Sequence, residues 1–189
     1  MRIAIYGGSF NPPHRAHALV ASWMVSSGAV DQVWLVPVFE HAFEGIHQKS
    51  LAPFSLRMAW CQAMAEELGA SVAVSDVESR LPAPSYSVDT LDWLARAHPE
   101  HRFHLVVGAD ILGQTANWKS WDKIVDEYAP IIVGREGYAH EESLSPGAPT
   151  FPAVSSTEVR ARLKNGESID GLVTPAVALA LSKDNPWRK

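Results

Sequence analysis

Apolar runs alternate with amphipathic stretches along most of the chain, and this alternation constrains the fold more than any other feature. Runs rich in β-branched and aromatic residues predict buried strands at 2–6, 32–38, 71–77, 102–107 and 130–133. Amphipathic spacing predicts helices at 18–27, 55–68, 87–97 and 155–164. Strands that alternate with helices are joined by right-handed crossovers, which leave them parallel. We therefore expect an α/β fold with a Rossmann-like, doubly wound, mainly parallel sheet and helices on both faces.

Length and composition agree with a single globular unit. A chain of 189 residues buries about two thirds of its unfolded surface on folding, so residues 1–189 can form one domain around a substantial core. We expect its C-terminal part, about 155–185, to be helical. Apolar residues make up 47% of the chain and charged residues 20%, but no apolar stretch reaches the roughly 20 residues of a membrane helix.

Charge and cysteine content narrow the class of partner. The net charge is -5 and lysines and arginines form no run, which argues against nucleic-acid binding and favours a small-molecule partner. Cys61 is the only cysteine, and the N-terminus shows no secretory signal, so we expect a reducing, cytoplasmic location. The sequence leaves the oligomeric state open, a homo-oligomer included.

The first predicted strand leads directly into a candidate phosphate site. It ends at Gly7 and Gly8, where the absence of a Cβ lets the backbone approach a phosphate. His14 and His17 follow, three residues apart, so both imidazoles lie on one face of the first helical turn. Histidines at this spacing can also belong to a metal site, but no third ligand with suitable spacing follows.

A second candidate site opens the helix predicted near the C-terminus. Ser155 or Ser156 can cap this helix, and Glu158 stands where a capping box needs it. Free backbone N–H groups, the helix dipole, two spare hydroxyls and Arg160 one turn inside are together the parts of a polyphosphate clamp. Other nucleotide-binding patterns are missing, namely Gly-x-Gly-x-x-Gly, the P-loop lysine motif and His-Glu-x-x-His.

Both segments resemble signatures of one superfamily. Gly8-x-Phe10-x-Pro12-x-His14-x-x-His17 resembles the first signature of the nucleotidyltransferases, with Ala16 where a glycine usually stands. The stretch from Val154 to Arg160 resembles their second signature, Ile-Ser-Ser-Thr-x-x-Arg, with valine in place of isoleucine.

Three further segments are similar to the mononucleotide adenylyltransferases of nicotinate and nicotinamide. Residues 85–91, Ser-Tyr-Ser-Val-Asp-Thr-Leu, differ from the family's stretch only by a serine for a threonine at Ser87. A Gly-x-Asp ending at Asp110 precedes a tryptophan segment, 118–122, and Arg135 matches an arginine after the last strand. The resemblance extends from residue 3 to about 173.

The resemblance implies an enzyme of NAD biosynthesis that transfers AMP from ATP to nicotinate mononucleotide, with Mg²⁺ as cofactor and pyrophosphate as the second product. It implies catalytic roles for His14, His17 and Arg160. ATP would be bound by Gly8, Ser9, Phe10, Asp110, Arg135, Ser155, Ser156 and Thr157, and the mononucleotide by Lys49, Tyr86, Thr90 and Trp118. No residue is assigned to a metal.

Two alternatives stay open at this level. Nicotinamide mononucleotide could be the acceptor, since an amide and a carboxylate are nearly isosteric. A non-catalytic nucleotide-binding module is the other alternative, motivated by Ala16 and by the unusual long loop at 39–53, in which Lys49 is the candidate replacement for the family's loop lysine.

Overall fold

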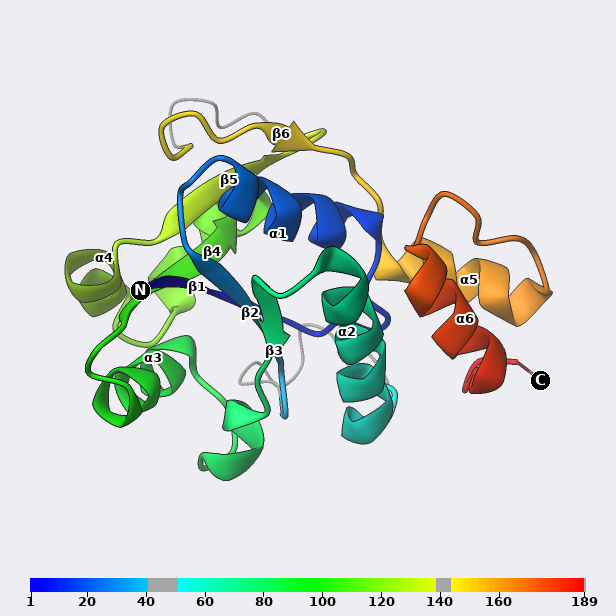
Figure 1. Ribbon diagram of the computed structural model, residues 1–189, viewed down its shortest axis with the longest axis horizontal. Helices are drawn as coiled ribbons and strands as arrows, with labels where there is room; N and C mark the ends of the chain where they lie inside the picture. Colours follow the sequence, from blue (N-terminus) through cyan, green and yellow to red (C-terminus); the bar gives the residue numbers. More distant parts are fainter. Residues whose placement is uncertain (41–50, 139–143, 189) are drawn as a thin grey trace.

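A single six-stranded sheet organises the protein. The computed structural model describes residues 1–40, 51–138 and 144–188. Within them every strand pair is parallel, and the strand order is β3-β2-β1-β4-β5-β6 (Figure 1). The strands are β1 (Arg2–Gly8), β2 (Gln32–Pro37), β3 (Val72–Val74), β4 (Arg102–Gly108), β5 (Ile131–Arg135) and β6 (Thr150–Phe151). This order confirms the predicted Rossmann-like fold.

Helices cover both faces of the sheet (Figure 1). They are α1 (Arg15–Ser26), α2 (Phe54–Leu68), α3 (Ser87–Ala97), α4 (Trp121–Tyr128), α5 (Ser156–Asn165) and α6 (Pro175–Lys183), with 3-10 helices η1 (Val77–Arg80) and η2 (Ala109–Asn117). Successive side chains of a strand point to opposite faces, so Ala4 joins the core under α1 and α2, and Ile3 and Ile5 join the core under α3 and α4. The first core continues to α5 and α6.

The strand order reverses between β1 and β4, and this reversal fixes where a ligand can bind. From β1 the chain passes through α1 to β2 and β3 on one side, and then returns to place β4, β5 and β6 on the other. In open α/β sheets the crevice at the carboxyl ends of the strands, at such a switch point, is the usual binding site. The ends of β1, β4 and β5 are Gly8, Gly108 and Arg135, which places three predicted site segments at this edge.

The strand predicted over 71–77 is wrong in length. Only Val72–Val74 pairs with β2, and the chain then turns into η1. Val77 is buried in the core beneath α3, and the Glu78 carboxylate accepts a hydrogen bond from the backbone N–H of Phe39 at 3.0 Å. These two anchors draw the chain away from the sheet edge.

Two segments carry more regular structure than the sequence predicts. Residues 109–117, which have no assigned element in the prediction, form η2. The predicted exposed connection at 143–152 contains β6, which pairs with β5 and buries Phe151; its residue 143 lies outside the described residues. A two-residue strand is too short for periodicity to reveal.

Helix starts also differ from the prediction. The first helix begins at Arg15, three residues earlier than predicted, with His14 at the N-cap. The helix predicted from residue 55 begins one residue earlier, at Phe54, after Pro53. The predicted end of this helix at residue 68 is confirmed; Gly69 follows it with a φ of 98°, a value that glycine adopts most readily.

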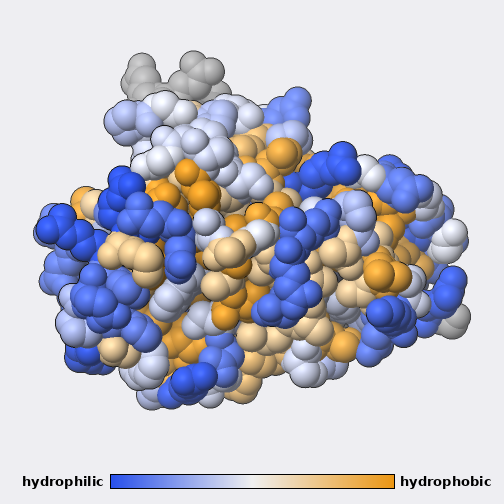
Figure 2. Space-filling view, in the orientation of Figure 1, coloured by the Kyte–Doolittle hydropathy of each residue, from blue (hydrophilic) through white to orange (hydrophobic). Residues whose placement is uncertain are grey.

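The outer surface mixes polar and apolar residues. Figure 2 shows hydrophilic residues interspersed with small hydrophobic areas on the face that carries α1 and α2. Among the described residues, no helix has the length and apolar character needed to cross a membrane.

Candidate active site

The turn after β1 is built around a buried phenylalanine. Phe10 has a φ of 43° and a side chain that is 1% exposed. Its ring packs edge-on against Tyr6 at 5.7 Å and against His17 at 4.9 Å between ring centroids. The phenyl group therefore helps to fix the imidazole of His17 by direct ring contact. Any contact of Phe10 with ATP would come from its backbone.

His14 and His17 share one face, as their spacing predicts. Their rings stack with centroids 3.7 Å apart. The backbone N–H of His14 donates to Nδ1 of His17 at 3.0 Å. Since Nδ1 of His17 acts as an acceptor, the proton of the neutral ring is on Nε2. The Nδ1 atom of His14 is buried and has no hydrogen-bond partner among the described residues.

Both imidazoles are neutral at physiological pH. Burial lowers the pKa of His14 to about 3, and the positive charge of Arg135 contributes to the shift. Burial also holds the pKa of His17 well below its usual range, with smaller effects of His14 and Arg135. A neutral imidazole still donates one hydrogen bond, so the pair can bind phosphate oxygens as donors without carrying charge.

The start of α5 docks on the loop that carries His14. Nη1 of Arg160 donates to the carbonyl oxygen of Asn11 at 2.8 Å, and the Ser156 hydroxyl donates to the carbonyl oxygen of Pro12 at 2.8 Å. These contacts join residues 149 and 144 positions apart in the sequence. The two predicted phosphate motifs are therefore side by side.

The hydroxyls at this helix start are less free than the sequence predicts. Ser155 is the N-cap, and its oxygen accepts from the N–H of Glu158 at 3.2 Å. The Ser156 hydroxyl donates its proton to the Pro12 carbonyl of the β1–α1 loop. The Thr157 hydroxyl oxygen accepts from Nη2 of Arg160 at 3.1 Å. The Ser155 and Thr157 bonds use oxygen lone pairs, so these two hydroxyls keep a proton to donate to a phosphate.

Asp110 and Arg135 form an ion pair at the ends of β4 and β5, with 2.6 Å between Nη1 and Oδ2. The Asp110 carboxylate also folds back against Gly108, where any Cβ would clash with its Oδ1 atom. The pair also acts electrostatically on β1. Burial is the main cause of the raised pKa of Tyr6, and the negative charge of Asp110 raises that pKa further. Both residues thus lie near the imidazoles, at the edge where β1 and β4 diverge.

The residues predicted for the mononucleotide are gathered less tightly. Tyr86 and Lys119 line a cavity of about 460 Å³, and the Lys119 ammonium lies 4.8 Å from the Tyr86 ring centroid and 2.7 Å from the Asp89 carboxylate. Trp118 is half-buried and packs edge-on against Trp121 at 5.4 Å.

Two other residues of that predicted group stand apart. Thr90 is buried, and its hydroxyl has no partner among the described residues. A ligand would reach this hydroxyl only if neighbouring side chains moved. Lys49 lies outside the described residues.

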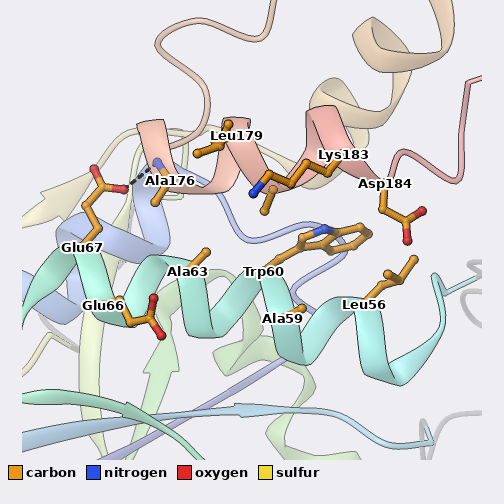
Figure 3. Close-up of a pocket in the computed structure, with 11 residues that line it drawn as sticks. Leu56, Ala59, Trp60, Ala63, Glu66, Glu67, Ala176, Leu179, Lys183 and Asp184 are labelled. Atoms are coloured by element: carbon orange, nitrogen blue, oxygen red, sulfur yellow. Dashed lines mark hydrogen bonds between the residues drawn. The ribbon is translucent and has the colours of Figure 1, made fainter.

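The larger of the two described cavities is elsewhere. It measures about 500 Å³ and lies between α2 and α6, with Trp60 below and Leu179 and Lys183 above (Figure 3). Glu67 closes one end by accepting the backbone N–H of Ala176 at 2.9 Å. None of the predicted site residues lines this cavity, and the candidate active site stays at the sheet edge.

Sequence reasoning missed one buried charge beside the site, that of Arg57. Its side chain is 1% exposed and donates to three backbone carbonyls. A signal was present: Arg57 occupies the first position of the buried face of α2, which continues through Trp60, Cys61, Met64 and Ala65. A charged residue in an apolar stripe needs a buried partner.

Comparison with known proteins agrees with this fold. The Cytidylyltransferase-like family profile matches residues 5–162, which span both phosphate motifs. The chain therefore belongs to the cytidylyltransferase-like nucleotidyltransferases.

Curated relatives narrow the class. A protein of Anaeromyxobacter sp. (strain K) named "Probable nicotinate-nucleotide adenylyltransferase" is 46% identical over 98% of this chain and 96% of its own length. A relative of the same name from Myxococcus xanthus is 34% identical over 98% of this chain and 93% of its own. Nicotinic acid mononucleotide adenylyltransferase of Plasmodium falciparum, solved with NaAD, has the same fold, with a TM-score of 0.79, 23% identity and coverage of 98% and 97%. Within its class, the chain is a member of the nicotinate-nucleotide adenylyltransferase family.

Proposed function

We propose that this protein transfers the adenylyl group of ATP to nicotinate mononucleotide, giving nicotinate adenine dinucleotide and pyrophosphate, a step of NAD biosynthesis. One observation supports this most directly: Arg160 and Ser156 of the second motif bind the carbonyls of the loop that carries His14. The choice of nicotinate mononucleotide as acceptor follows the names of the curated relatives.

In this reaction a phosphate oxygen of the mononucleotide attacks the α-phosphorus of ATP. The bond from that phosphorus to the bridging oxygen breaks, and pyrophosphate leaves with the electron pair. The protein needs no nucleophile of its own, so its work is to hold two anions together and to stabilise charge on the phosphate oxygens.

The residues at the sheet edge fit that work. Nε2–H of His17 and the imidazole of His14 would donate to phosphate oxygens of ATP as neutral groups. Arg160 has guanidinium N–H groups beyond those bound to Asn11 and Thr157, and with the α5 N-terminus it would hold the leaving pyrophosphate. Arg135, paired with Asp110, adds a positive charge near the same imidazoles.

Mg²⁺ would accompany ATP rather than occupy a protein cage. Within the described ranges, no group of three His, Cys, Asp or Glu side chains could hold a metal ion. Mg²⁺ is commonly held by substrate phosphates and water, so it would arrive with ATP. When bound, Mg²⁺ would neutralise charge on the phosphate oxygens.

Acceptor choice is tested by pyrophosphate release. Purified protein is incubated with ATP, Mg²⁺ and either nicotinate or nicotinamide mononucleotide. We expect release with the nicotinate compound, and a lower kcat/KM with the nicotinamide compound. Equal turnover with both would contradict the acceptor choice.

The transfer itself is tested by the variant His17→Ala, which should lose pyrophosphate release by a factor of about 100 or more while keeping its circular dichroism spectrum. ATP binding by the parent protein without pyrophosphate release from either acceptor would instead identify a nucleotide-binding module.

A further inference from the structure

Arg57 lies behind the active site, where β1 and β2 separate. The last hydrogen bond between these strands runs from the N–H of Val38 to the carbonyl oxygen of Gly8 at 2.9 Å. One residue further, Nη1 of Arg57 donates both to the carbonyl oxygen of Ser9 at 3.0 Å and to that of Val38 at 2.7 Å. Two carbonyls cannot bond to each other, so the guanidinium supplies the donor that links the diverging chains.

The same guanidinium reaches a third segment. Its Nε donates to the carbonyl oxygen of Ala52 at 3.0 Å, and the N–H of Ala52 donates to the side-chain oxygen of Asn11 at 3.0 Å. Ala52, two residues before the start of α2, is thereby tied to Arg57 through its carbonyl and to the β1–α1 loop through its N–H. Arg57 thus acts on that loop directly at Ser9 and indirectly at Asn11.

A buried carboxylate complements this charge. Glu78 accepts the N–H of Phe39 at 3.0 Å, and that N–H belongs to the same peptide unit as the Val38 carbonyl. One peptide at the exit of β2 is therefore held by Arg57 at its oxygen and by Glu78 at its nitrogen. Burial lowers the pKa of Arg57 and raises the pKa of Glu78, and the charge of each residue opposes the shift of the other.

These bonds determine the direction of the loop's carbonyls. Arg57 binds the carbonyl of Ser9 from the protein interior, and Arg160 and Ser156 bind those of Asn11 and Pro12. A carbonyl held in this way cannot turn its negative end toward a bound phosphate. The imidazoles of His14 and His17 follow two and five residues after Pro12, so their placement depends on the same bonds.

We propose that Arg57, which holds the Val38–Phe39 peptide together with Glu78, is a positioning residue for adenylyl transfer, which fixes the β1–α1 loop so that His14 and His17 meet the phosphates of ATP. This inference rests on the proposed function. It assigns to Arg57 no contact with substrate, since its side chain is buried and its Nε and Nη1 atoms donate to backbone carbonyls.

The test is a double-mutant cycle with Arg57→Lys and His17→Ala, read by kcat and KM for each substrate. Lysine keeps the charge but lacks the planar fork that bridges several carbonyls. Arg57→Lys should lower kcat about 10- to 100-fold, because small displacements of catalytic groups cost rates of this size. KM for the mononucleotide should be unchanged, since Tyr86 and Lys119 lie in a cavity that Arg57 does not line.

The double variant distinguishes positioning from general damage. If Arg57 acts through the imidazole, Arg57→Lys should have little further effect on kcat in the His17→Ala background. Effects on kcat that simply multiply, or an Arg57→Lys enzyme with parental kcat, would overturn the inference. Arg102→Lys is the matched control, because this exposed arginine begins β4 at the opposite edge of the sheet, and it should keep parental kinetics.

A second variant keeps the test decisive if Arg57→Lys fails to fold. Glu78→Gln retains an oxygen for the N–H of Phe39 but removes the charge, so it should lower kcat and should also be non-additive with His17→Ala. A multiplicative result in that cycle would overturn the inference in the same way. Failure of the proposed function is distinct, because the parent protein itself would then release no pyrophosphate.

Discussion

The neutral state of the buried His14 makes a quantitative prediction about stability and pH. Its pKa is lowered from 6.5 to about 3, chiefly by burial. Between these values the unfolded chain binds a proton at this side chain and the folded chain does not. The free energy of unfolding therefore rises with pH through this window, and the full penalty is reached only below the folded pKa.

The size of the effect follows from the same shift. A pH of about 5 lies roughly 1.5 units below the pKa of this histidine in the unfolded chain. At 1.36 kcal/mol per pH unit, protonation of the unfolded chain then destabilises the fold by about 2 kcal/mol. Near pH 7.5 the contribution is close to zero. In the variant His14→Gln this titration is absent, so its loss of stability between the two pH values should be smaller by about 2 kcal/mol.

Urea unfolding followed by circular dichroism at both pH values measures this difference. The comparison is between pH-dependent losses, so a constant cost of the substitution cancels. Leu179→Gln, an exposed and non-titrating exchange on α6, should keep the parental dependence. Equal losses for the parent and His14→Gln would refute the neutral, buried imidazole and the donor role built on it.

Three further predictions test the site more locally. Arg160→Lys removes the fork that binds the Asn11 carbonyl, and kcat for pyrophosphate release should fall about 100-fold with an unchanged circular dichroism spectrum; a parental kcat would contradict the clamp. Gly108→Ala places a Cβ against the Asp110 carboxylate, so KM for ATP should rise severalfold while Gly113→Ala, which meets nothing within 4 Å, changes little. Ser155→Ala removes the α5 cap and should cost about 1 kcal/mol in urea unfolding, a loss that would not appear if the hydroxyl served the ligand alone.

Local patterns predicted most elements correctly, and one of the misses shows what such patterns leave out. The helix predicted over 87–97 matches α3 at both ends, because its polar start, apolar stripe and His98-Pro99 stop are all local signals. The strand predicted over 71–77 fails because Val77 and Glu78 are drawn into contacts with α3 and Phe39. Such contacts join positions far apart, and no periodicity reports them.

The sequence by itself determined the α/β class, the positions of the two predicted phosphate motifs and the shared face of His14 and His17. Each of these depends on spacing within a few residues, which strand and helix geometry convert directly into position. Tertiary structure alone decided that Arg160 and Ser156 bind the β1–α1 loop, that Asp110 pairs with Arg135, and that Arg57 links two diverging strands. The physical reason is that a buried donor must find an acceptor, but which carbonyl it finds is settled only when packing brings distant segments together.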